Sequence, residues 1–180
     1  FSIDGNALYD KLCLKYTESP AKQHYSDILQ LHDAKVPLHS TTDLGIKINQ
    51  ALPFVLRSKL VFIHHIKAAS LPGNNPQDGA AARYDKGWAW SPVRTFGNYY
   101  VGIDTVAPVL SAMQKGTNFR KIKNIRFKVS DKMTSVKEFR AELDGKWLCF
   151  VRAGNVYTYT FDEHCPPGQH KLMIKASDEN

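Results

Sequence analysis

The feature that most constrains this chain is a period of two in its apolar residues. Over Ile122–Ser130, the side chains of Ile125, Phe127 and Val129 share one face, while polar residues occupy the other. The same alternation recurs over Val156–Phe161. Successive residues of a strand point to opposite faces of the sheet, so this pattern predicts half-buried strands. Helical periodicity is nowhere sustained for long, and an all-β fold is expected.

Turn signals divide the second half of the chain into short strands. Asp144-Gly145 is a dipeptide suited to the positive φ angles of a tight hairpin. It separates a strand around Phe139–Leu143 from a returning strand over Lys146–Val151. A second turn at Ala153–Asn155 precedes Val156–Phe161, and Gln169–Ser177 supplies the last strand. Such closely spaced strands predict a small antiparallel β-sandwich of the immunoglobulin-like kind.

The chain is long enough for two such sandwiches in tandem. Its 180 residues exceed the roughly 100 of one sandwich. Asp104–Pro108 is expected to link two domains, because the proline keeps the backbone before it extended. We therefore expect domains at residues 1–103 and 104–180. A long loop is expected over Ala68–Ala82, and strands in the first half are predicted over Leu8–Tyr16, Leu44–Asn49, Lys59–Ile66 and Gly97–Ile103.

A series of segments resembles a known protein family over nearly the whole chain. The segments include Ala7–Asp10, Pro37–Ser40, Leu56–Lys59, Arg94–Gly97, Ile103–Pro108, Phe139–Trp147 and Tyr157–Asp162. They look like the C-terminal immunoglobulin-like region of bacterial envelope zinc metallopeptidases of the lysostaphin type. The resemblance implies that the catalytic domain lies N-terminal to these modules, that this chain is an accessory part of a longer protein, and that it acts in the periplasm, at the cell envelope or outside the cell.

The zinc-binding segments of such peptidases are matched only in part. Zinc peptidases of that type use a His-x-x-x-Asp segment and a separate His-x-His segment, and His39 with Asp43 has the first spacing. The adjacent pair His64-His65 cannot replace the second, because neighbouring strand residues face opposite sides. His39 is expected at the start of a loop and Asp43 as a turn cap. The chain is thus predicted to hold no catalytic residues, no metal and no cofactor, and not to be an enzyme.

Neither a calcium site nor a nucleic-acid-binding surface is expected in this chain. Carboxylates at Asp131, Asp178 and Glu179 could bind calcium at one end of a sandwich, but turn residues bonded to nearby amides are the expected role. The net charge of +7 is expected to reflect solvated sheet faces, so no nucleic-acid partner is predicted. No apolar stretch is long enough for a membrane span.

The three cysteines, Cys13, Cys149 and Cys165, are not expected to form a disulfide framework, because their number is odd. Cys149, between Leu148 and Phe150, is expected to be a buried small residue, although a bridge between Cys149 and Cys165 is an open alternative. Trp147 is two residues before Cys149, so in a strand both side chains point to the same face, and Trp147 is also expected in the core.

Aromatic residues near Trp88 suggest a binding surface. Trp88 and Trp90 are one residue apart, so an extended backbone directs both indoles to one face, and Tyr99 is nearby in sequence. Such a platform could stack on sugar rings, although core packing of these rings is the commoner arrangement. An open edge strand is another possible binding mode.

Together, these features predict non-catalytic scaffold, partner-binding or regulatory modules of a cell-wall (peptidoglycan) metallopeptidase. The expected partner is the adjoining peptidase domain or another envelope component. The alternative is a carbohydrate-binding module for peptidoglycan or another glycan, with Trp88, Trp90 and Tyr99 as its ligand-binding residues.

Overall fold

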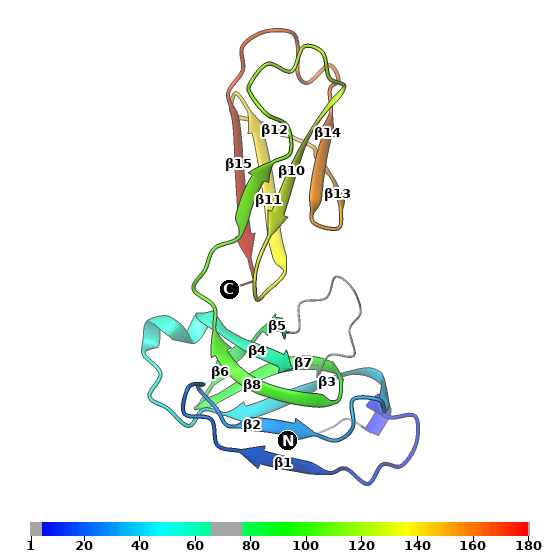
Figure 1. Cartoon of the computed structure of the whole chain (residues 1–180), viewed down its shortest axis with the longest axis vertical. Helices are drawn as coiled ribbons and strands as arrows, with labels where there is room; N and C mark the ends of the chain where they lie inside the picture. The colour runs from blue at the N-terminus through cyan, green and yellow to red at the C-terminus, as the bar shows by residue number, and fades with distance from the viewer. Residues whose placement is uncertain (1–4, 66–76, 180) are drawn as a thin grey trace. The chain divides into compact units, whose positions relative to one another are not determined.

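A computed structural model describes residues 5–65 and 77–179 of the chain (Figure 1). Nearly all regular structure is β, which confirms the predicted fold class, and all strand pairs are antiparallel. The chain divides into two compact units between Thr105 and Val106. No helix in the described ranges has the length and apolar character needed to cross a membrane.

In its described residues, unit 1 contains two sheets, a five-stranded sheet in the order β1-β2-β8-β4-β5 and a three-stranded sheet in the order β3-β7-β6. Two short 3-10 helices, η1 (Gly5–Ala7) and η2 (Phe54–Lys59), accompany them. The strands are β1 (Tyr16–Ser19), β2 (Ile28–Leu31), β3 (Pro37–Lys47), β4 (Leu60–His65), β5 (Gln77–Ala81), β6 (Arg83–Asp85), β7 (Trp88–Thr95) and β8 (Gly97–Ile103).

The core of unit 1 lies between these two sheets. Leu31, Phe62 and Val101 from the five-stranded sheet pack in one cluster with Leu44 and Ala89 from the three-stranded sheet. All five side chains are at most 2% exposed. Burial of these apolar side chains gives the unit a core of its own.

The strand predictions for unit 1 have mixed outcomes. Gly97–Ile103 is confirmed as β8, and the predicted strands at Lys59–Ile66 and Leu44–Asn49 overlap β4 and β3. The strand predicted at Leu8–Tyr16 is wrong: the chain has no regular structure over residues 8–15, and Leu8, Leu12 and Leu14 pack against the core from that segment. Of the predicted loop at Ala68–Ala82, residues 68–76 lie outside the described part, while residues 77–81 form β5 beside β4.

Unit 2 has a four-stranded sheet in the order β13-β14-β10-β9 and a three-stranded sheet in the order β12-β11-β15. Its core includes Ile125, Val129, Tyr157 and Tyr159 from the first sheet with Ala141 and Leu143 from the second. The strands are β9 (Val109–Ala112), β10 (Asn124–Ser130), β11 (Val136–Leu143), β12 (Lys146–Leu148), β13 (Val151–Ala153), β14 (Val156–Thr160) and β15 (Leu172–Asp178).

The turns predicted for unit 2 are confirmed. Asp144 and Gly145, with φ angles of 51° and 81°, connect β11 to β12, and Leu143 pairs with Lys146 across the turn. Gly154, with φ of 60°, lies in the turn between β13 and β14. Each unit thus has two sheets enclosing a core, and its membership of the immunoglobulin-like class stays a prediction.

The strand predicted over Lys146–Val151 is in fact two strands in different sheets. β12 pairs with β11, whereas β13 pairs with β14, so the chain crosses from one sheet to the other at residues 149–150. Leu148 is 3% exposed and Phe150 contacts core rings, while Trp147 is 62% exposed. The expectation that Trp147 is in the core is therefore wrong. Neighbouring strand residues point to opposite faces, so Trp147 points outward where Leu148 points into the core.

The cysteines also differ from expectation. Cys149 is exposed rather than buried. It lies where the chain crosses between the sheets, and like Trp147 two residues before it, it points away from the core. Cys13, Cys149 and Cys165 are all free, so Cys149 and Cys165 are not bridged.

Candidate binding surfaces

Trp88 and Trp90 lie together on the outer face of the three-stranded sheet of unit 1. On β7 they alternate with Ala89 and Ser91, which are 0% and 1% exposed and point toward the core. Both indoles are half-buried, and their ring centroids are 6.2 Å apart at an interplanar angle of 34°. The two rings form a small apolar surface, the Trp88–Trp90 platform.

A glycine on the neighbouring strand makes room for this platform. Gly45 of β3 pairs with Trp90, and a Cβ atom on Gly45 would lie 2.7 Å from the Cη2 and Cζ3 atoms of the indole. The ring therefore lies flat over the backbone of β3. A glycine in a strand interior often marks such a close approach.

Charged side chains border the Trp88–Trp90 platform. Asp85 pairs with Trp88 and Arg83 pairs with Trp90 across β6 and β7. The Arg83 Nη1 and Asp85 Oδ2 atoms are 4.0 Å apart, and both side chains are largely exposed. An aromatic surface beside exposed donors and acceptors can stack on a sugar ring and hydrogen-bond its hydroxyls.

Tyr99 does not belong to this platform. It lies in β8 of the other sheet and is 3% exposed, with its ring stacked on His64 at 4.4 Å between centroids. Its hydroxyl donates to the carbonyl oxygen of Thr95 at 2.7 Å, and burial raises its pKa. Its assignment as a ligand-binding residue is corrected, because proximity in sequence to Trp90 does not place it on the same sheet.

The residues that partly match the zinc pattern lie in strands. His39 and Asp43 are both exposed residues of β3, so the loop start and the turn cap predicted for them are wrong. The ring of His39 meets Tyr9 edge-on at 4.9 Å. Within the described residues, neither His39 nor Asp43 belongs to a group of three potential metal ligands. The side chain of His65 lies outside the described part.

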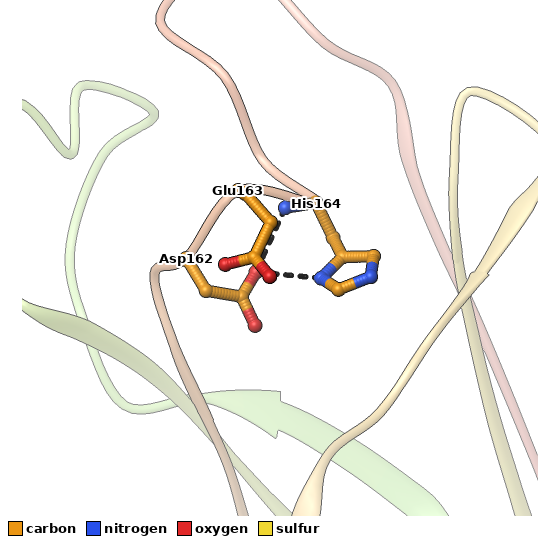
Figure 2. A group of neighbouring side chains, drawn as sticks. All are labelled: Asp162, Glu163 and His164. Carbon is orange, nitrogen blue, oxygen red and sulfur yellow. Dashed lines mark hydrogen bonds and ion pairs between the residues drawn. The ribbon is translucent and has the colours of Figure 1, made fainter.

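One exposed loop brings together Asp162, Glu163 and His164 (Figure 2). Asp162 Oδ1 accepts hydrogen bonds from the backbone N of His164 at 3.0 Å and from the Tyr159 hydroxyl, and lies 3.3 Å from His164 Nδ1. The Tyr159 hydroxyl bond lowers the pKa of Asp162, while burial, followed by the Asp162 contact, raises the pKa of Tyr159. This carboxylate oxygen is already engaged in holding the turn.

The carboxylates considered for calcium have similar local roles. Asp131 Oδ1 accepts hydrogen bonds from the backbone N atoms of Met133 and Thr134, both at 2.8 Å. Ser135 Oγ donates to Glu179 Oε1 at 2.7 Å. Asp178, at the end of β15, has a carboxylate oxygen within 4.8 Å of one from Asp131. Asp131 thus has the turn-holding role expected from sequence.

Arg57 of η2 is a candidate binding residue that the sequence analysis did not identify. Its guanidinium carbon lies 4.5 Å from the Tyr84 ring centroid and 5.4 Å from that of Phe54. A 3-10 helix has three residues per turn, so Phe54 and Arg57 share one side of it. The three-residue spacing of Phe54 and Arg57 after Pro53 was visible in the sequence. Tyr84 lies too far along the chain for its contact with Arg57 to be predicted from that spacing.

Comparison with known proteins gives one family. The model of the Zu5-like domain matches residues 1–104, which are more than half of the chain and nearly all of unit 1. No curated protein and no solved structure matches the chain.

Proposed function

The chain belongs to the Zu5-like domain family through residues 1–104, and on that premise we propose that it is a non-catalytic module that binds and positions an adjoining domain. The resemblance of its sequence to accessory regions of lysostaphin-type peptidases makes a cell-wall zinc peptidase domain the proposed neighbour. The proposed location is the periplasm, the cell envelope or the extracellular space.

The edge strand β9 is the observation that supports a partner-binding role. It lies at the end of the four-stranded sheet of unit 2, and all four of its residues are exposed. Val109 is 55% exposed, Leu110 38% and the following Met113 46%. An exposed edge offers backbone donors and acceptors to an added strand, and apolar side chains beside it favour burial by a partner.

The test measures binding of the full chain to the separately expressed upstream peptidase domain. Val109→Lys places a charge on the β9 edge and should weaken binding by at least about tenfold, or about 1.4 kcal/mol. Val151→Lys is the matched control, because Val151 is 69% exposed on the opposite edge strand, β13. No binding by the unmodified chain, or equal weakening by both substitutions, would refute the proposed role of β9.

A second candidate function is glycan recognition by the Trp88–Trp90 platform. The rings lie side by side on the outer face, next to the exposed Arg83 and Asp85 side chains. Aromatic faces of this kind present apolar area together with a polar handle, which suits sugar rings.

Binding to purified peptidoglycan separates this candidate from the first. Replacing both Trp88 and Trp90 with alanine should abolish glycan binding, while Trp147→Ala removes an exposed indole from unit 2 and should leave it intact. Thermal unfolding of each variant checks that the fold survives. An unchanged affinity in the double variant would eliminate the platform as a glycan site.

A further inference from the structure

A hollow lies over β1 and β2, at one edge of the five-stranded sheet of unit 1. Its volume is about 410 Å³, which is within the range of about 300–1,000 Å³ that is typical of small-molecule sites. Five of its six lining residues are exposed and the sixth, His32, is half-buried, so a ligand can reach them from solvent. The residues that define this β1–β2 hollow are Lys15, Tyr16, Thr17, Gln30, His32 and Asp33.

The pairing of β1 with β2 places two polar side chains of the hollow side by side. Thr17 pairs with Gln30, and its Oγ1 atom donates to Gln30 Oε1 at 3.5 Å. Leu29 and Leu31 are 8% and 1% exposed in the core, so Gln30 between them points to the outer face of the sheet. Beyond their mutual contact, the hydroxyl has lone pairs and the amide has two N–H groups, which remain for a ligand.

The end of β2 forms another side of the hollow. The chain turns at His32, whose φ angle is 48°, and the backbone N of His32 donates to the carbonyl oxygen of Lys15 at 2.8 Å. The imidazole meets the ring of Phe96 edge-on at 5.3 Å, and Phe96 is 0% exposed. Asp33 follows, and its Oδ1 atom accepts a hydrogen bond from the backbone N of Lys35 at 3.0 Å. These contacts restrict both side chains before a ligand arrives.

The mixture of groups in the hollow narrows the chemistry of its ligand. Lys15 is a cation and Asp33 an anion, so a ligand with a single charge of either sign meets one charge of its own sign. Thr17 and Gln30 are neutral and offer both donors and acceptors. A sugar hydroxyl also donates and accepts, so it can pair with each kind of group present here. Tyr16, which is 64% exposed, adds an aromatic side chain to the lining.

We propose that the β1–β2 hollow binds a small neutral saccharide. Thr17 and Gln30 exchange hydrogen bonds with its hydroxyls, Lys15 donates to them and Asp33 accepts from them. The hollow lies on the five-stranded sheet, and it shares no residue with the β9 edge or with the Trp88–Trp90 platform. Its test is therefore independent of the proposed function.

The test titrates the nitrogen-15-labelled full chain with glucose, galactose, mannose and N-acetylglucosamine in turn. At least one of these neutral sugars should bind in the millimolar range, about 1–10 mM, and shift the backbone amide resonances of Thr17, Gln30 and Asp33. Glucosamine, glucuronate and the amino acid alanine test a positive, a negative and a doubly charged ligand. Unmoved resonances with all four neutral sugars, or tighter binding of any charged ligand, would overturn the proposal.

Substitutions locate the saccharide within the chain. Thr17→Val combined with Gln30→Ala removes both central polar groups and should weaken sugar binding at least about tenfold. The matched control combines Thr41→Val with Gln169→Ala, because Thr41 is an exposed residue of β3 and Gln169 is an exposed residue of unit 2. Full binding by the first variant, or equal weakening in both, would contradict the assignment. If the first variant does not fold, the resonances shifted in the unmodified chain decide the case.

The double alanine variant of Trp88 and Trp90 separates the hollow from the platform. It should keep the sugar-induced shifts at Thr17 and Gln30, and their loss would place the sugar on the platform instead. A single sugar bound in the millimolar range dissociates quickly, so the hollow alone should not retain the chain on washed peptidoglycan. The peptidoglycan test of the platform therefore keeps its meaning whichever way the titration ends.

Discussion

His170 faces acceptor groups on both of its ring nitrogens. Its Nδ1 atom lies 2.7 Å from Asp144 Oδ2, and its Nε2 atom lies 2.8 Å from the carbonyl oxygen of Pro166. A carboxylate and a carbonyl both accept hydrogen bonds, so the imidazolium form satisfies the two contacts at once. Lys171 donates its backbone N–H to Asp144 Oδ1 at 2.8 Å, which completes a link between the β11–β12 turn and the start of β15.

This link predicts a pH-dependent stability of unit 2. The hydrogen bond to Asp144, followed by that to Pro166, raises the pKa of His170; the Lys171 backbone bond, followed by that to His170, lowers the pKa of Asp144. Stability from His170 is full below about pH 6.5 and is lost as the pH rises through its raised pKa. Stability from Asp144 is full above about pH 4 and is lost as the pH falls through its lowered pKa.

Thermal unfolding at different pH values tests the link. The unfolding temperature of unit 2 should fall more between about pH 6 and about pH 8.5, a range that begins near the ordinary histidine pKa and extends above it, in the unmodified chain than in His170→Gln. The nearby ionisable groups Cys165 and Lys146 are kept in both proteins. His39→Gln removes an exposed histidine of unit 1 and should leave this difference unchanged. Identical pH profiles for His170→Gln and the unmodified chain would contradict the prediction.

The alternation of side chains along a strand predicted that Trp88 and Trp90 lie on one face, but it did not predict the positions of Tyr99 and Arg57. The local backbone of β7 determines where both indoles point, so alternation alone was sufficient. The burial of Tyr99 depends on which face of β8 packs against the other sheet, and the contact of Arg57 with Tyr84 depends on how η2 meets β6. Both are determined by tertiary packing, which leaves no local pattern.

At the scale of elements, the crossover between β12 and β13 predicts opposite effects at neighbouring residues. Leu148 is 3% exposed in the unit 2 core, so Leu148→Ala should lower the free energy of unfolding by about 2–5 kcal/mol. Trp147 points outward, and Trp147→Ala should change it by less than about 0.5 kcal/mol. Denaturant unfolding followed by circular dichroism measures both. A larger loss for Trp147→Ala would place the indole in the core after all.

In unit 2, the strands that were predicted well are those with clear alternation of apolar and polar residues. β10, β11 and β14 have this alternation, turns were also predicted after β11 and before β14, and the positions of the three strands agree closely with expectation. The change of sheet at residues 149–150 was missed, because an unbroken run of strand-forming residues gives no sign that its pairing partner changes. Leu8–Tyr16 failed for the related reason that apolar spacing also fits an irregular segment whose leucines pack on the core.

At the scale of the whole molecule, the separate cores predict two unfolding events. Leu44 is 0% exposed in the unit 1 core, so Leu44→Ala should destabilise unit 1 by about 2–5 kcal/mol. The transition that changes the fluorescence of Trp88 and Trp90 should move, and the transition reported by Trp147 should stay in place. Fluorescence-detected thermal unfolding of variants that keep only the unit 1 tryptophans or only Trp147 separates the two signals. One cooperative transition shifted by Leu44→Ala would show that the units unfold together.

The positions of β9 beside β10 and of β15 beside β11 also have a mechanical consequence for unit 2. β9 begins at Val109 opposite Ser130, and β15 ends at Asp178 opposite Val136, so the chain enters and leaves the unit at neighbouring points (Figure 1). A force that separates these two points loads the ladder hydrogen bonds of each terminal strand one after another, starting from the pulled end. Strands loaded in this way peel open at low force, whereas strands pulled from opposite ends share the load across all their bonds. We therefore expect a force applied at these two points to open unit 2 strand by strand, rather than across all of its backbone pairing at once.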